Sequence, residues 1–194
     1  MTTAARIVLG DCEEALQELI VCDSDEAFST SPDLEKPKLR NFSANIGSIR
    51  RRRWMTVVSL LRAVGHVLKN VDGKSSPMLG EIIETEWDAL IKTKPEPLIL
   101  WGFIENERNT VLKEYRFRSQ GVAWGVCVTS LTVPTTSGPV TLKANKGASN
   151  MEFRLLADGP FAGRNDVDVV TEAIQWWKIY LDKIDALEGE RGTS

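Results

Sequence analysis

The stretch that decides the fold is IRRRRWMTVVSLLRAVGHVLKNV, residues 49–71. On a helical wheel of about 100° per residue, four apolar residues share one face: Val57, Leu61, Val64 and Leu68. The basic and polar residues of its second half lie on the other side. The pattern predicts a long amphipathic helix that packs one face against other helices. Gly65 lies at the edge of the apolar face, either to let a neighbouring helix approach closely or as a tolerated surface glycine.

Apolar spacing of the same kind predicts further helices on both sides of this stretch. They are expected over residues 4–21, 77–92, 98–118 and 166–187. Thr2 or Thr3 should cap the first, and Ser75 or Ser76 the helix that begins with Pro77. The segment 23–37 reads as a loop, and Asp72-Gly73 as the end of the helix over 49–71.

Beyond Gly121 the apolar residues alternate with smaller ones, which is typical of strands. Strands are expected over 122–128, 140–144 and 151–157, with a turn over 134–139, and they should form a small antiparallel sheet supported by a helix. We therefore expect an α+β fold that is mainly α: a four- to five-helix bundle with this sheet inserted before the C-terminal helix. One domain should cover residues 1–194, with the bundle over 1–120, the strands over 121–158 and the last helix over 165–187.

Composition indicates an ordinary globular protein, with 42% hydrophobic and 26% charged residues. The start lacks a signal-peptide pattern, and charged residues interrupt the longest apolar run, so we expect a cytoplasmic protein without membrane contact. Cys12, Cys22, Cys127 and the single histidine are not spaced as metal ligands. We expect reduced thiols, no metal and no cofactor.

Charge is distributed unevenly along the chain. Residues 1–35 carry nine acids and one base, whereas residues 36–71 carry nine bases and no acid. Arg50, Arg51, Arg52 and Arg53 stand at the start of the expected helix, where positive charge opposes the helix dipole. We expect the acidic segment to neutralise them. The alternative is that these arginines bind an external polyanion such as RNA.

A second informative stretch is FIENERNTVLKEY, residues 103–115. On the wheel, Ile104, Val111 and Tyr115 centre an apolar stripe, Glu107 falls inside it and Arg108 lies at its edge. Burying either charge without a partner costs on the order of several kcal/mol, as it does when a buried ion pair loses one of its two partners. Each therefore needs a counter-charge, and Glu107 and Arg108 are candidates for a purely structural charge pair.

The same stretch resembles the motif of HEPN-domain proteins, bacterial helical-bundle proteins of which many are toxins or defence RNases. That motif has Arg, then a polar residue that is commonly Asn, then His and, in one branch, Tyr two positions later. The resemblance implies that Arg108 is the motif Arg, Asn109 the polar residue and Tyr115 the branch-specific Tyr. It also implies a dimer whose interface brings the motif residues together.

This chain departs from the family at Lys113, which stands in the position of the His. Histidine suits proton transfer near neutral pH, whereas an ordinary lysine is protonated there and suits phosphate binding. We therefore expect a non-catalytic interaction or regulatory protein, a homodimer that contacts RNA or an acidic protein. His66, on another helix, should be an ordinary exposed or hydrogen-bonded histidine.

Two other functions stay open. One is a metal-independent RNase of toxin–antitoxin or phage-defence type, with Arg108, Lys113 and Tyr115 as the candidate catalytic residues. The other is a small-ligand module with a pocket between the strands and the last helix. Trp176 and Tyr180, one helical turn apart, should stack either as part of the core or as a partner surface.

Overall fold

The residues 49–71 lie within a longer helix and the turn that follows it. The computed structural model describes residues 1–28, 36–123, 131–135, 138–142 and 152–192, and it gives the backbone alone for 22–28, 36–47, 120–123, 131–135, 138–142 and 152–153. Helices dominate it, as predicted. They are α1 (Thr3–Phe28), α2 (Lys36–Val67), the π-helical turn η1 (Leu68–Asp72), α3 (Gly73–Ser75), α4 (Pro77–Lys92), the π-helical turn η2 (Ile99–Glu105), α5 (Asn106–Glu114) and α6 (Asp166–Gly192).

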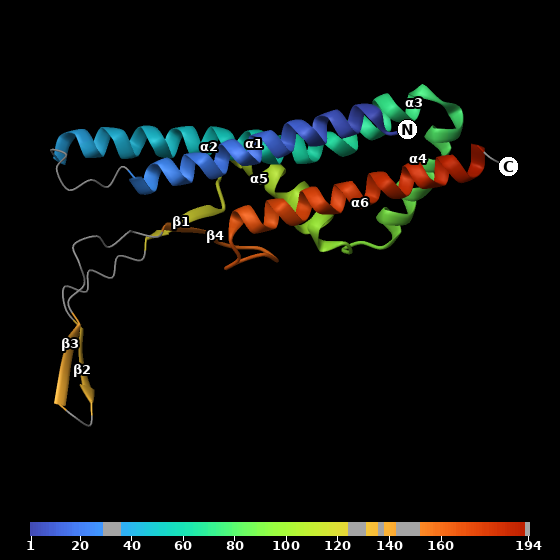
Figure 1. Ribbon diagram of the computed structural model, residues 1–194. Coiled ribbons are helices and arrows are strands. Elements are labelled where there is room, and N and C mark those ends of the chain that lie inside the picture. The colour runs from blue at the N-terminus through green and yellow to red at the C-terminus, as the bar shows by residue number, and fades with distance from the viewer. Residues whose placement is uncertain (29–35, 124–130, 136–137, 143–151, 193–194) are drawn as a thin grey trace.

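The long helices lie side by side (Figure 1). α1 and α2 run antiparallel to each other, and α6 packs against α1, α2 and α4. The N-terminus, α3 and the last turn of α6 lie at the same end of the molecule. Within the described ranges, no helix is both long and apolar enough to cross a membrane.

The core contains the apolar face predicted from residues 49–71. All four residues of that face are fully buried: Val57, Leu61, Val64 and Leu68. Gly65 lies against two tryptophan rings, because a Cβ added there would stand 2.8 Å from Trp177 Cη2 and 3.2 Å from Trp87 Cη2. The close-approach interpretation of Gly65 is therefore the right one, although the neighbours are ring edges and not a helix backbone.

Several predicted helix ends are wrong. α1 continues to Phe28, so part of the expected loop over 23–37 is helical, while residues 29–35 lie outside the described part. α2 begins at Lys36, which puts Arg50–Arg53 in the helix interior, away from the amides of its first turn that create the dipole penalty. Asp72-Gly73 does not end the helix, because η1 leads on into α3.

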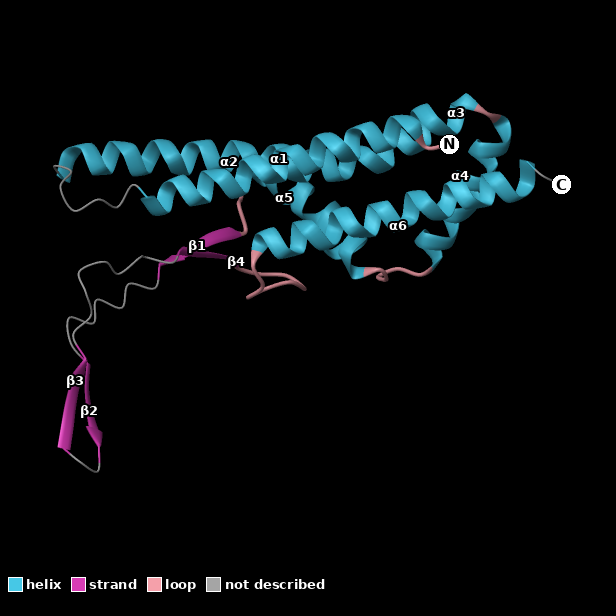
Figure 2. Cartoon of the chain, in the orientation of Figure 1, coloured by secondary structure: helices cyan, strands magenta, loops and turns pink. Residues whose placement is uncertain are grey.

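The strands pair antiparallel in two separate ladders (Figure 2). β1 (Ser119–Ala123) pairs with β4 (Glu152–Leu156), and β2 (Leu131–Thr135) pairs with β3 (Gly138–Leu142). The expected single sheet is thus not observed among the described residues. The prediction over 122–128 lies mostly outside them, and β2 takes in residues that we assigned to the turn. β1 and β4 lie beside the start of α6, where Leu155 bridges to Asn165.

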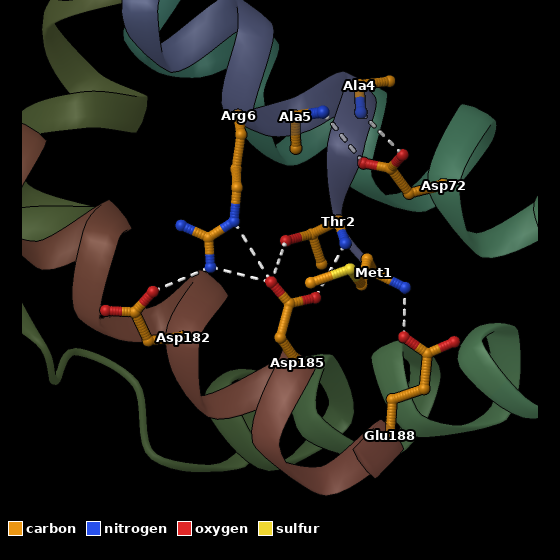
Figure 3. Close-up of polar contacts among 9 residues, drawn as sticks. All are labelled: Met1, Thr2, Ala4, Ala5, Arg6, Asp72, Asp182, Asp185 and Glu188. Atoms are coloured by element: carbon orange, nitrogen blue, oxygen red, sulfur yellow. Dashed lines mark hydrogen bonds and ion pairs between the residues drawn. The ribbon is translucent and has the colours of Figure 1, made fainter. Parts of the chain in front are cut away.

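The first turn of α1 is capped by a residue that is far from it in the sequence. Asp72, at the end of η1, accepts hydrogen bonds from the backbone amides of Ala4 (2.9 Å) and Ala5 (2.8 Å), as Figure 3 shows. Thr2 stands directly before the helix, as expected of the cap residue, and its backbone oxygen accepts from Arg6 N at 3.2 Å, but its hydroxyl is used elsewhere. A carboxylate at a helix N-terminus satisfies amides that have no partner within the helix.

The Thr2 hydroxyl binds Asp185 of α6 instead. Asp185 accepts from Thr2 N (2.7 Å), Thr2 Oγ1 (3.0 Å) and Arg6 Nη2 (2.7 Å), and Arg6 also pairs with Asp182. Burial raises the pKa of the Asp185 carboxyl, but the bonds from Arg6 and Thr2 outweigh burial and hold that pKa below its ordinary value. We call Thr2, Arg6, Asp72, Asp182 and Asp185 the N-terminal clasp.

Candidate functional site

The four arginines at 50–53 do not form one surface. Arg50 is buried, and it donates from Nη2 to Asp166 Oδ2 (2.7 Å) and from Nη1 to Ser119 Oγ (2.9 Å). Asp166, in the first turn of α6, is fully buried as well. Arg50 therefore joins α2 to α6 and is not accessible to an external polyanion.

The other three arginines have different surroundings. Arg53 donates to the backbone oxygen of Glu18 (2.6 Å) and lies 3.6 Å from its carboxylate, so the expected neutralisation by the acidic segment holds at this position. For Arg50, the carboxylate partner among the described side chains is Asp166, which lies outside that segment. Arg51 and Arg52 are exposed, and Arg52 donates to Ser48 Oγ at 3.3 Å. Within this block, only Arg51 and Arg52 are positioned to meet a polyanion freely.

Glu107 and Arg108 do not pair with each other. Glu107 is buried, accepts from Trp54 Nε1 (3.1 Å) and lies 3.8 Å from Arg118 Nε. Burial raises the pKa of the Glu107 carboxyl, and the opposing effects of Trp54 and Arg118 do not cancel that rise. Glu107 is thus a polar part of the core with partners from other elements, whereas Arg108 points elsewhere.

Arg108 lines a hollow between α2 and α5, which we call the α2–α5 groove. It measures about 540 Å³, and its walls are Ser59, Arg62, Ala63, His66, Glu105, Arg108, Asn109 and Leu112. Arg62 forms an ion pair with Glu105, at 3.0 Å between Nε and Oε1. Arg108 donates to Asn109 Oδ1 at 3.1 Å, and among the described residues no carboxylate pairs with it. One guanidinium of the groove is therefore neutralised and the other is not.

Helical spacing explains how the groove is built. Arg62 and His66 are four residues apart on α2, and Glu105 and Asn109 are four apart across η2 and α5, so each pair shares one face. The apolar faces of both segments are turned to the core, which directs these polar faces toward each other. Sequence reasoning missed that His66 and Arg108 line the same hollow. Two polar stripes on neighbouring amphipathic helices were the available signal.

His66 keeps one ring nitrogen without a partner among the described residues. Its Nδ1 lies 3.3 Å from Asn70 Nδ2, which also donates to the His66 backbone oxygen at 2.9 Å. An amide nitrogen can only donate, so Nδ1 accepts and the neutral ring carries its proton on Nε2. The expected exposed, hydrogen-bonded histidine is confirmed, but its location beside Arg108 was not foreseen.

The rest of the HEPN-like motif lies outside the groove. Lys113 and Tyr115 are exposed, and neither lines the hollow. Tyr115 was expected at the centre of an apolar stripe, and this is wrong because α5 ends at Glu114. Tyr115 takes a left-handed conformation (φ 50°), is 68% exposed and packs edge-on against Phe117. Ile104 and Val111, the other two residues of that stripe, are buried as predicted.

A second hollow adjoins the groove, and we call it the Trp101 hollow. It measures about 490 Å³ and is lined by Lys94, Pro95, Trp101, Glu105, Asn106 and Asn109. It shares Glu105 and Asn109 with the groove. The Lys94 ammonium lies over the Trp101 ring, 3.8 Å from its centroid. Together the two hollows place cations, amides and an aromatic ring along one side of η2 and α5.

The remaining candidates belong to the core. Trp176 and Tyr180 stack with their ring centroids 5.2 Å apart, and because Tyr180 is buried the core interpretation is the right one.

Cys12 is also buried, which raises the pKa of its thiol to about 12 and removes its nucleophilic character at neutral pH. Among the described residues, no group of His, Cys, Asp or Glu side chains is arranged to hold a metal. Cys127, the side chain of Cys22 and much of the pocket expected beside the strands lie outside the described part.

Comparison with models of known protein families, with curated proteins and with solved structures finds no match for this chain. The HEPN resemblance therefore stays a prediction carried by the motif residues alone. The arrangement of the α2–α5 groove and the Trp101 hollow provides the basis for a functional conclusion.

Proposed function

We propose that the protein binds single-stranded RNA through phosphate contacts in the α2–α5 groove, as a non-catalytic interaction or regulatory protein on a HEPN-like helical bundle. The observation that carries this proposal is the state of Arg108. It is half-buried in a hollow, and the described part of the chain gives it no carboxylate partner. A guanidinium held in this way retains its charge and most of its donors for an anion.

Comparison with other arginines supports this interpretation. Among the described side chains, the arginines with a carboxylate partner include Arg6, Arg50, Arg53, Arg62, Arg116, Arg118, Arg164 and Arg191. Arg108 has the amide oxygen of Asn109 instead, which orients the guanidinium without neutralising it. The planar fork of donors matches the geometry of a phosphate group.

The neighbours of Arg108 suit the same ligand. Arg62 reaches the groove with its charge partly offset by Glu105, and His66 offers the N–H of Nε2 as a further donor. Glu105 opposes phosphate binding, so the groove carries only a small excess of positive charge. We expect moderate, salt-sensitive affinity for a short stretch of RNA rather than tight binding to a long polyanion.

The test is fluorescence anisotropy with a short 5′-labelled oligo-uridylate over a salt series. Arg108→Ala should weaken binding about 10-fold or more, as expected for a lost charged hydrogen bond. The slope of log affinity against log salt should fall by about 0.7 for one lost phosphate contact. Arg191→Ala, which removes an exposed arginine that lines neither hollow, is the matched control. Equal weakening by both substitutions, or none by Arg108→Ala, would refute the proposal.

A metal-independent RNase is the second candidate, and one observation favours it. His66 and Arg108 line the same groove, so a histidine is present although Lys113 occupies the motif position. Nε2 becomes a proton acceptor in the other tautomer of His66, in which the ring gives up the contact between Nδ1 and Asn70. In that form, a proton acceptor and a guanidinium in one groove could activate a ribose hydroxyl and stabilise the phosphate it attacks. Cleavage of oligo-uridylate in EDTA, abolished by both His66→Ala and Arg108→Ala, would establish this activity. Binding without cleavage would support the leading proposal.

We propose in addition that the protein forms a homodimer through the surface next to the groove. Leu112 and Tyr115 are 46% and 68% exposed, and both lie at the end of α5. Exposed apolar side chains that gather near a candidate site are typical of an interface. Light scattering of the parent protein and of Leu112→Asp with Tyr115→Ser should give the dimer mass and the monomer mass respectively. A monomer at tens of micromolar in the parent would contradict this proposal.

A further inference from the structure

The Trp101 hollow differs chemically from the groove that it adjoins. The groove holds Arg62, Arg108 and His66, whereas the Trp101 hollow holds an indole ring, a proline ring and two amide side chains. Glu105 and Asn109 form the wall that both share. A ligand that occupies both hollows therefore needs an anionic part next to a flat, weakly polar part.

The indole ring of Trp101 is fixed in position. Its Nε1 donates to the backbone oxygen of Glu96 at 3.2 Å, and its ring packs edge-on against Trp87 at 6.3 Å and 69°. Trp101 is half-buried, so part of the ring stays accessible in the hollow. An aromatic ring held by its edge and its polar atom offers a prepared stacking surface, because little freedom is lost when a flat ligand binds.

The ring face is covered at present by a replaceable group. The Lys94 ammonium lies 3.8 Å from the ring centroid, and the Lys94 side chain is exposed. An exposed cation–π contact is weak, since the ammonium regains full hydration when it leaves. Lys94 can therefore move aside for a stacking ligand and place its charge beside that ligand's phosphate.

We propose that the Trp101 hollow binds a base of the RNA strand whose phosphate contacts Arg108; this inference rests on the proposed function. The base stacks on Trp101, and the amide side chains of Asn106 and Asn109 line the hollow beside it. Asn106 can donate to and accept from the base edge, whereas Asn109 offers its N–H donors because its Oδ1 already accepts from Arg108. Glu105 disfavours a phosphate in the hollow but accepts hydrogen bonds from base amino or imino groups. The ligand is thus a nucleotide unit of a single strand, read by stacking in one hollow and by charge in the other.

The test compares two labelled probes of equal length and charge, an oligo-uridylate and the same ribose-phosphate backbone without bases. The parent protein should bind the oligo-uridylate more tightly than the abasic strand. Trp101→Ala should weaken binding of the oligo-uridylate about 5- to 150-fold, the range for loss of one stacked base, and leave the abasic strand unaffected. Trp101→Phe should keep most of the preference, because it keeps a stacking ring. Leu98→Ala, an exposed apolar residue that lines neither hollow, should behave as the parent.

The outcomes separate this inference from the proposed function. Arg108→Ala should weaken binding of both probes, since it removes a phosphate contact. Equal affinity of the parent for the two probes, or Trp101→Ala with the affinities of Leu98→Ala, would overturn the base site and leave the phosphate groove standing. No binding of either probe by the parent would overturn both. Circular dichroism and the thermal midpoint of each variant show whether a loss reflects unfolding, and a folded Trp101→Phe that loses all preference would also refute stacking.

Discussion

The N-terminal clasp and the α2–α5 groove each contain an arginine on a helix, and the fold treats the two differently. Arg6 of the clasp meets two carboxylates of α6, whereas Arg108 of the groove meets the amide of Asn109. The clasp joins α1 to α6 and satisfies its charges within the protein, so its role is structural. The groove leaves charge unsatisfied within the described residues, which costs stability unless an external anion compensates. Partners, and not residue type, distinguish the two.

The most deeply buried charge pair should have the largest effect on stability. Arg50→Ala leaves Asp166 buried without its cation, and breaking such a pair costs about 3–5 kcal/mol. Urea unfolding followed by circular dichroism measures the loss. Arg51→Ala, an exposed neighbour on the same helix, should change the free energy of unfolding by less than about 0.5 kcal/mol. A similar small change for Arg50→Ala would mean that α2 and α6 do not depend on this contact.

The cap on α1 should rank next. Asp72→Ala leaves the amides of Ala4 and Ala5 without their acceptor and should cost about 1–3 kcal/mol in unfolding free energy. Asp72→Asn keeps one acceptor oxygen and should cost less. Neither substitution should alter RNA affinity of the folded protein, since the clasp is structural. A variant with full stability, or with weakened RNA binding at full stability, would break the distinction between the two regions.

Acid should weaken the clasp through Asp185. Its folded-state pKa lies below the ordinary value of 3.8, because the bonds from Arg6 and Thr2 outweigh burial. The carboxylate therefore stabilises the fold above about pH 4, and this contribution is lost as the pH falls through the folded-state pKa. Asp185→Asn should be destabilised relative to the parent at pH 7, and the difference should shrink in acid. Parallel stability curves for the two proteins across that range would show that Asp185 is not the group responsible.

The smallest stability effect should come from Arg108. Arg108→Ala removes no ion pair among the described residues and should leave unfolding free energy within about 0.5 kcal/mol of the parent, or slightly above it. Lys113→Ala, outside the groove, should change neither stability nor RNA affinity appreciably. A large destabilisation by Arg108→Ala would mean that Arg108, like the residues of the clasp, has a structural role.

Local signals in the sequence were sufficient for one helix in full. α4 spans Pro77–Lys92 as predicted, because Ser76 accepts from the Leu79 amide, Pro77 occupies the first turn and the prolines after Lys94 end the helix. The buried face of residues 49–71 followed equally from periodicity, since helical spacing alone determines which residues share a side. The predicted ends were wrong at Phe28, where no glycine or proline marks the end of α1, and at Lys36, where Pro37 in the first turn of α2 was assigned to the loop.

Only the tertiary structure decided which charges meet. Arg50 and Asp166 are 116 residues apart and lie in elements whose relative placement no local pattern specifies. In the same way, the motif at residues 108–115 predicted one site, yet the end of α5 separates Arg108 from Tyr115, and the packing of α2 on α5 brings His66 beside Arg108 instead. Periodicity reports the face of a helix on which a residue lies. The partner across that face depends on how whole helices pack, a property of the complete chain.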